Sequence, residues 1–185
     1  MSIKFEKATL QYKELVISWL DKPYVQEFWD NSDAYRMDLD IFMKGRKVQS
    51  LYFNGVFDYW IGAKNGEPFC LMMSNQVSAD DDIPDLWKAN LSSTGHTVSL
   101  DFMIGEDGFL GKGLAAIAIN EFIAFYRSNI DTEADIFLID PDRNNPKALR
   151  AYGNAGFISA GQFLAGSGIF EGQETVLMTK KMSNY

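Results

Sequence analysis

One segment of this sequence constrains its fold more than any other: a strand that runs into a glycine-rich turn, which then opens a helix. The glycines are Gly105, Gly108, Gly111 and Gly113, and Lys112 lies between the last two. Glycine lets the backbone approach an anion closely, and the first turn of a helix offers unpaired N–H groups and the positive end of the helix dipole. The segment therefore predicts a site for a phosphate or pyrophosphate group, with a tight turn that binds nothing as the alternative.

Two common nucleotide-binding motifs do not fit this segment. A P-loop needs four residues between its first glycine and the Gly-Lys-Ser/Thr sequence, whereas Gly105 and Gly111 are one residue too far apart and Gly113 follows the lysine. A Rossmann motif belongs in the first strand–helix–strand unit, with an acidic residue about 20 positions later. The glycine turn comes after the middle of this chain, which argues against both.

The order of strands and helices along the chain predicts an α+β protein with a mixed sheet rather than a doubly wound one. Apolar runs indicate strands at 3–10, 57–64, 67–74, 96–104, 134–139, 157–164 and 175–181. Helical spacing of apolar residues indicates helices at 11–20, 24–29, 33–44, 114–126 and 146–155. The pair Asn65-Gly66 predicts a tight hairpin, and residues 78–93 predict an acidic loop with one helical turn at 85–90.

The helix expected at 114–126 has one strongly apolar side. Spacing of three and four residues places its buried side chains together, and we expect these to be Leu114, Ile117, Ala118, Phe122 and Phe125. The later helix is expected to stop at Gly156, because glycine is the preferred residue just past a helix end.

Composition narrows the class of protein. The 185 residues fit one domain, expected to span 1–185. A net charge of −8 disfavours nucleic acid as a partner and favours a cationic ligand. There is no run of about 18 apolar residues and no signal-peptide pattern at the N-terminus, so we expect a cytoplasmic protein without a membrane partner. With one cysteine, Cys70, and one histidine, His96, neither an internal disulfide nor a Cys/His metal site is expected.

A second motif follows the glycine turn by about 30 residues. Residues 140–157 read Asp-Pro-x-x-x-Asn-x-x-Ala-x-x-x-Tyr-x-x-x-Gly-Phe. Together with Gly113 and Ala115 of the turn, this pattern resembles the acetyltransferases of the GNAT superfamily, whose first motif is Arg/Gln-x-x-Gly-x-Gly/Ala; Leu110 stands here in the Arg/Gln position. The resemblance implies the GNAT fold, a mostly antiparallel twisted sheet of about seven strands flanked by helices with splayed central parallel strands, and acetyl-CoA as cofactor.

Within that superfamily the sequence is most similar to the aminoglycoside 6'-N-acetyltransferases. The segment from Trp19 to Trp29 resembles their N-terminal Trp-Leu-x-x-Pro-…-Glu-Trp-Trp segment, and Leu100-Asp101 corresponds to their Ile-Asp before the Gly-Lys-Gly-Leu turn. The resemblance implies direct transfer of an acetyl group to a small cationic amine in a ternary complex, by a protein that is a monomer or a homodimer. Acylation of a hydroxylysine-type siderophore precursor, acetylation of a peptide, and binding of acyl-CoA without catalysis are the alternatives.

The resemblance also implies roles for individual residues. Asp101 is the expected base and Tyr152 the expected acid or cofactor contact, and both are catalytic candidates. The acceptor is expected to contact Asp101 and Asp140, with Trp29 and Glu171 as further candidates beside the acidic loop of Asp80, Asp81 and Asp82. The cofactor is expected to contact a larger set, some of it through backbone N–H groups: Phe102, Met103, Gly111, Lys112, Gly113, Leu114, Ala115, Asn145, Ala148 and Tyr152.

Structural roles are the alternatives for three of these residues. Asp101 could bond to the turn that follows it, and Tyr152 could be a core aromatic side chain. Asp140 could cap the next helix, although Asp142 and Asn144 are expected to be better placed for that.

Overall fold

The computed structural model describes residues 2–47, 57–166 and 168–182. Within these residues the strands form a seven-stranded sheet of order β1-β2-β3-β4-β5-β7-β6. The pairs β1–β2, β2–β3, β5–β7 and β6–β7 are antiparallel, and β4–β5 is parallel. This topology confirms the predicted α+β fold. The strands are β1 (Ile3–Lys7), β2 (Asp58–Lys64), β3 (Glu67–Val77), β4 (His96–Ile104), β5 (Ala134–Ile139), β6 (Ile158–Leu164) and β7 (Glu174–Lys181).

The chain is built from two compact units, which are described one after the other. The first unit consists of Met1–Ser74 and Phe102–Leu114, and the second of Asn75–Asp101 and Ala115–Tyr185. The border between the units therefore falls inside β4 and again at the start of helix α5 (Leu114–Asn129).

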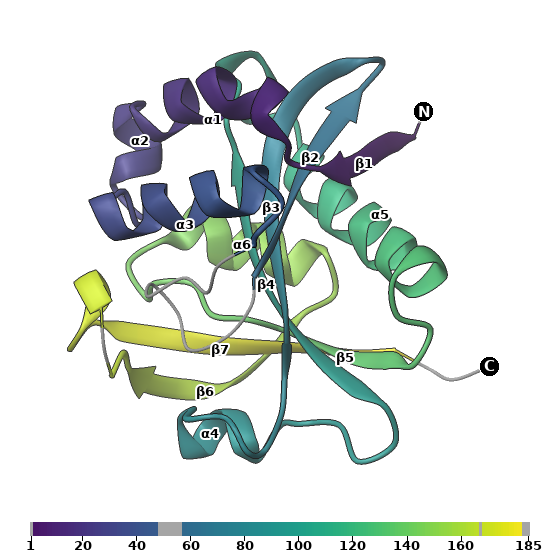
Figure 1. The fold of residues 1–185 in the computed structure, drawn as a ribbon. Helices are drawn as coiled ribbons and strands as arrows, with labels where there is room; N and C mark the ends of the chain where they lie inside the picture. The colour runs from purple at the N-terminus through teal and green to yellow at the C-terminus, as the bar shows by residue number, and fades with distance from the viewer. Residues whose placement is uncertain (1, 48–56, 167, 183–185) are drawn as a thin grey trace. The chain divides into compact units, whose positions relative to one another are not determined.

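In the first unit, three short helices gather beside strands β1 to β3 (Figure 1). They are α1 (Lys13–Leu20), α2 (Pro23–Gln26) and α3 (Asp33–Met43). The predicted hairpin between β2 and β3 is confirmed: Asn65 and Gly66 both have positive φ, at 54° and 84°. That pair of angles is typical of the two-residue turn whose twist matches that of the flanking strands.

Aromatic side chains form the core of the first unit. Trp19, Tyr35 and Tyr59 are fully buried, and the rings of Tyr35 and Tyr59 meet edge to face with centroids 6.0 Å apart. The buried carboxylate of Asp38 accepts hydrogen bonds from the hydroxyl of Tyr59 and from the guanidinium of Arg46. These partners satisfy a charge that would otherwise be costly to bury.

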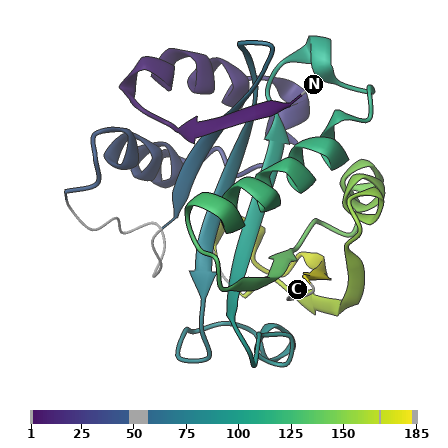
Figure 2. The same cartoon turned by 90° about the vertical axis from the view of Figure 1, so that its right-hand side faces the viewer.

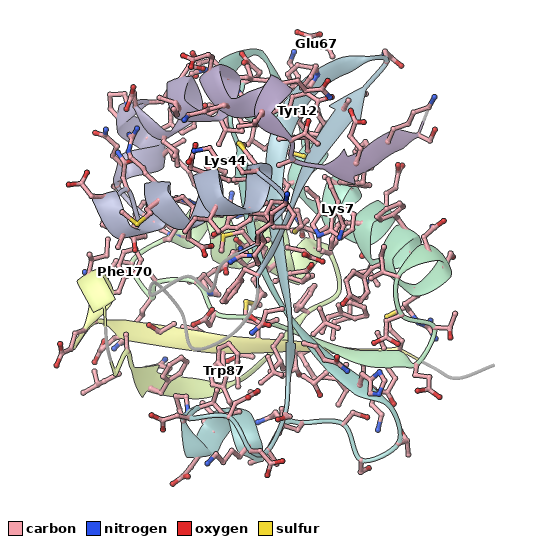
Figure 3. The ribbon with its side chains drawn as sticks, in the orientation of Figure 1. Lys7, Tyr12, Lys44, Glu67, Trp87 and Phe170 are labelled. Atoms are coloured by element: carbon pink, nitrogen blue, oxygen red, sulfur yellow. The ribbon has the colours of Figure 1, made fainter. Side chains whose placement is uncertain are left out.

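In the second unit, α5 lies on one face of the strands, and Figure 2 shows this side with α6 (Pro146–Asn154) beside it. The ring of Tyr126 on α5 packs edge to face on Phe137 of β5, with centroids 6.1 Å apart. A smaller apolar cluster forms around Trp87 of helix α4 (Asp85–Lys88), whose ring meets Phe163 of β6 at 6.3 Å. Figure 3 labels Trp87.

The paired part of the parallel strands β4 and β5 lies in the second unit. The pairing runs from His96 and Ala134 to Ser99 and Leu138, and β5 ends at Ile139. The expected splaying of the central strands stays a prediction.

The buried side of helix α5 differs from the one predicted from the sequence. Ile117 is 47% exposed and Phe125 is half-buried, whereas the buried stripe is made of Leu114, Ala118, Ile119, Phe122, Ile123 and Tyr126. At about 100° per residue, the centre of this stripe lies about 150° around the helix from Ile117. The apolar sequence on nearly every side of this helix concealed which face is buried.

Most predicted elements are present with ends that differ by a few residues. The first strand stops at Lys7 rather than Leu10, because Leu10–Tyr12 forms a 3-10 turn that leads into α1. The second helix begins at Pro23, which suits a first helical position, and ends at Gln26. Among the described helices, none is both long enough and apolar enough to cross a membrane.

Candidate active site

Two carboxyl groups and a phenol come together in the second unit. Asp101 lies on β4, Asp140 directly follows β5, and Tyr152 lies on α6. Because β4 and β5 are parallel, their carboxyl ends meet at the same edge of the sheet, which is where open α/β sheets place their ligands. The three side chains interact electrostatically, since the charge of Asp101 raises the pKa of both Asp140 and Tyr152.

Burial controls the ionisation of the two carboxyl groups. Burial raises the pKa of Asp101 to about 6. Burial also raises the pKa of Asp140 well above its usual range, and the neighbouring charge of Asp101 adds to that shift. Two carboxyl groups in one site resist carrying two negative charges, so they titrate as a pair. Near neutral pH such a pair can take up a cation or a proton.

Tyr152 keeps its proton under all physiological conditions. Its side chain is 7% exposed, and burial raises its pKa, with the charges of Asp101 and Asp140 as further causes. The ring packs on Phe157, with centroids 6.5 Å apart. The ring of Tyr152 is therefore buried, as its structural alternative predicted. Its protonated hydroxyl can donate a proton, and it lies close enough to Asp101 and Asp140 for their charges to affect its pKa.

The residue that caps the N-terminus of α6 differs from those expected. Asn145 itself is the N-cap, and its Oδ1 accepts a hydrogen bond of 3.0 Å from the backbone N–H of Ala148. Asp142 instead accepts from the backbone N–H of Asn144, so neither of these residues caps the helix as expected. Since its Oδ1 is engaged, Asn145 offers a ligand mainly its Nδ2 donor.

The glycine turn has the geometry that a pyrophosphate requires. Gly111 and Gly113 both adopt φ of 70°, a conformation in which other L-residues are strained. Both are exposed, as is Lys112, and a Cβ added at either glycine would have no protein atom within 4 Å. Because α5 begins at Leu114, its free N–H groups follow this open turn directly. The residues present therefore fit the pyrophosphate of a coenzyme A.

Three of the residues expected to contact the cofactor have buried side chains. The side chains of Phe102, Met103 and Leu114 are 9%, 7% and 6% exposed. Met103 packs in the apolar core of the first unit. We therefore expect these three residues to contact a cofactor through their backbone N–H groups. Two other expected contacts, Ala115 and Ala148, are half-buried.

The start of the glycine turn is held by residues to which sequence analysis assigned no role. Trp19 donates a hydrogen bond of 2.7 Å from Nε1 to Glu106, and Tyr24 donates one of 2.8 Å to the carbonyl of Gly105. Lys22 lies 3.7 Å from a carboxylate oxygen of Glu106 and 3.6 Å from one of Asp107. These contacts anchor the turn to α1 and α2.

Three further expectations concern the acceptor. Trp29 belongs to the first unit, where its ring packs edge to face on Tyr35 at 6.2 Å. Glu171 is exposed beside the turn Gly168–Phe170, and it is not among the groups that shift the pKa values of the carboxyl pair. Asp80, Asp81 and Asp82 are exposed in the loop after β3. Their contact with an acceptor stays a prediction.

The single cysteine and the single histidine, Cys70 and His96, have surroundings that suit a role in the structure. Cys70 is fully buried in the first unit, and burial raises the pKa of its thiol, so it is not a nucleophile at neutral pH. His96 begins β4, and its Nδ1 lies 2.8 Å from a carboxylate oxygen of Asp131. That contact raises the pKa of His96.

Comparison with known proteins is consistent with this geometry. Residues 12–164 match a family model described as an acetyltransferase (GNAT) domain. An aminoglycoside N(6')-acetyltransferase from Legionella pneumophila superposes with a TM-score of 0.74 at 24% identity, over 97% of this chain and 91% of that one.

Two structures of the aminoglycoside acetyltransferase AAC(6')-Ib are also similar. The structure with paromomycin and acetyl-CoA gives a TM-score of 0.76 at 19% identity, covering 98% of this chain and 94% of the other. The structure with coenzyme A and kanamycin gives 0.75 at 20% identity, covering 97% and 95%. At such low identity these likenesses concern the fold.

Proposed function

The chain belongs to the GNAT acetyltransferase family, and we propose that this acetyl-CoA-dependent N-acetyltransferase acetylates the 6'-amine of an aminoglycoside. The observation that carries the proposal is the pair of neighbouring carboxyl groups, Asp101 and Asp140, because a cationic amine would relieve the repulsion between their negative charges. The fold that the chain shares with aminoglycoside acetyltransferases supports the same acceptor. We further propose that residues 1–185 act as one catalytic domain, since the family match extends through both compact units.

Cofactor binding is assigned to the glycine turn and to α6. The exposed N–H groups around Gly113 and the N-terminus of α5 would hold the pyrophosphate, with Lys112 as a nearby cation. The Nδ2 group of Asn145 and the α6 turn at Ala148 would contact the rest of the cofactor. When bound, acetyl-CoA supplies the activated acetyl thioester. The N–H groups of β4 beyond Ser99, where the pairing with β5 stops, would polarise the carbonyl of that thioester.

Asp101 and Asp140 are proposed to bind and deprotonate the acceptor. A protonated amine cannot attack a thioester, so it must first give up a proton. With a pKa near 6, the Asp101 carboxyl is mainly ionised at neutral pH yet basic enough to accept that proton. The Asp140 carboxyl would pair with the cationic acceptor as it enters.

Tyr152 is proposed to act on the leaving group. Burial keeps its phenol protonated, so it can donate a proton to the thiolate as the carbon–sulfur bond breaks. No covalent intermediate on the enzyme is needed, which agrees with the buried position of Cys70.

A thiol-release assay across amine classes tests the proposed acceptor. Purified protein and acetyl-CoA would be mixed with kanamycin, an aminoglycoside that carries a hydroxyl in place of the 6'-amine, hydroxylysine, spermidine and a short peptide. We expect kcat/KM for kanamycin to exceed all others by at least about 100-fold, because the site is matched to one cationic amine. If hydroxylysine or the peptide were the preferred substrate, the acceptor would be that class of amine and not an aminoglycoside. Binding of coenzyme A without turnover of any amine would contradict catalysis.

A further inference from the structure

A hollow of about 420 Å³ lies in the second unit and shares no residue with the carboxyl pair or Tyr152. Its helical wall consists of residues of α5 spaced three, four, seven and eight positions apart, which share one face of a helix. Its other wall is the end of β7, where residues two apart point to the same side. The polar residues of the lining are Asn120, Arg127, Ser128 and Lys180, and the apolar ones are Ile123, Ala124 and Met182.

Two cations of this hollow, Arg127 and Lys180, form no ion pair with any of the described residues. The Nε atom of Arg127 is buried and has no hydrogen-bond partner among the described residues. The ammonium of Lys180 donates to Asn120 Oδ1 at 2.5 Å and to the carbonyl of Ala155 at 2.6 Å, and both of these acceptors are uncharged. Burial lowers the pKa of Lys180, as expected for an amine that is partly desolvated without a neighbouring carboxylate.

Several other lysine and arginine side chains of the described residues do form ion pairs with a carboxylate. Those that contact a carboxylate include Lys7, Lys13, Lys22, Arg36, Lys44, Arg46 and Arg143. Acidic groups are plentiful in a chain of net charge −8, yet these two half-buried cations face one hollow and form no ion pair with a described residue. A buried donor without an acceptor is unfavourable unless a ligand or water completes it.

We propose that the Arg127–Lys180 hollow is a binding site for a small organic carboxylate. The planar guanidinium of Arg127 matches the two oxygens of a carboxylate, and the ammonium of Lys180 supplies the second charge. The hydroxyl of Ser128 adds a donor at the rim. Ile123, Ala124 and Met182 offer an apolar wall to the hydrocarbon part of the ligand. An amine is repelled here, which separates this site from the proposed acceptor site.

Titration with sodium butyrate tests the site in the full-length protein. The ¹H–¹⁵N signal of the Arg127 Nε group, identified by its disappearance in Arg127→Gln, should shift and saturate as butyrate is added. Isothermal calorimetry should show affinity at least about tenfold weaker in Arg127→Gln and in Lys180→Gln, because each loses one charged contact. The matched controls Arg150→Gln and Lys181→Gln alter exposed cations and should bind butyrate as the unaltered protein does.

Three results would overturn the proposal. The first is a linear, unsaturated response to butyrate, or equal affinity in Arg127→Gln. The second is tighter binding of inorganic phosphate than of butyrate, which would make this a phosphate site. The third is saturation of the Arg127 signal by coenzyme A, which would make the hollow part of the cofactor site. Binding is measured without turnover, so the outcome is independent of the proposed acetyl transfer.

Discussion

The proposed chemistry depends most on Asp101, whose carboxyl has a pKa raised to about 6 by burial. A general base acts only when ionised, so kcat/KM should become constant well above pH 6 and fall about tenfold per pH unit well below it. The variant Asp101→Asn should lower kcat/KM by about 10²–10⁴-fold and remove this acidic decline. Steady-state rates between pH 4.5 and 8 would show both effects.

The neighbouring carboxyl supplies a control for that measurement. The proposed role of Asp140 is to pair with the cationic acceptor as a carboxylate, and asparagine keeps the shape of that side chain without its charge. Asp140→Asn should therefore weaken acceptor binding yet retain a decline in rate near pH 6. A decline that persists in Asp101→Asn and vanishes in Asp140→Asn would assign the base to Asp140 instead.

Gly105 should tolerate no side chain, because Trp19 occupies the space where one would lie. A Cβ at Gly105 would be 2.0 Å from Cδ2 of Trp19, whereas one at Gly108, in the same turn, would meet no atom within 4 Å. Gly105→Ala should destabilise the protein by about 1–3 kcal/mol or more through overpacking, and Gly108→Ala should change stability far less. Thermal unfolding compares the two, and equal melting temperatures would show that the Trp19 contact is not rigid.

Among single residues, the sequence predicted those that belong to a local motif. Asp101 lies within a strand, Asp140 follows a strand end and Tyr152 lies in a recognisable helix pattern, and the structure brings the three together. The hydrogen bond between Trp19 and Glu106 spans 87 positions, so no local pattern pairs them. Asn145 as the cap was missed because three adjacent residues, Asp142, Asn144 and Asn145, all have side chains suited to capping.

At the level of elements, the turn before α5 is predicted to determine cofactor affinity. Gly113 has φ of 70°, where an L-residue costs about 1–2 kcal/mol. Gly113→Ala should move the N–H groups of the turn and raise KM for acetyl-CoA by about 5–30-fold, the equivalent of that free energy, with a smaller change in kcat. Initial rates at varied acetyl-CoA concentration measure this.

Gly153 is the matched control for Gly113. It lies inside α6 without a positive φ, and a Cβ there would meet no atom within 4 Å. Gly153→Ala should stabilise the helix by about 0.5–1 kcal/mol and leave KM for acetyl-CoA unchanged. If both alanine variants raise KM equally, the backbone conformation of the turn is not what binds the cofactor.

Elements were predictable where the periodicity of the sequence is clear. The bounds of β4 and β5 are those expected, since each is rich in apolar residues and is flanked by glycine or by acidic residues. The buried face of α5 was not predictable in detail, because apolar residues occur on most of its sides and contacts with the strands decide which are covered. Helix ends such as Gln26 depend on the following chain, which local propensity does not describe.

For the molecule as a whole, the net charge of −8 favours a polycationic acceptor. Attraction between unlike charges is screened by salt, with a Debye length of about 10 Å at 0.1 M. KM for kanamycin should therefore rise several-fold between 20 and 300 mM NaCl. KM for the anionic acetyl-CoA should not rise in parallel, and initial rates at each salt concentration would separate the two. A KM for kanamycin that is insensitive to salt would show that attraction between unlike charges does not contribute to its binding.

The central claim is transfer of the acetyl group to one particular nitrogen, and the structure of the product tests it most directly. Kanamycin would be incubated with acetyl-CoA and the protein, and the product analysed by mass spectrometry and two-dimensional NMR. The account predicts a single added acetyl group on the 6'-nitrogen, and far slower formation of the same product with Asp101→Asn under the same conditions. An acetyl group on another nitrogen, or kanamycin recovered unchanged, would contradict it.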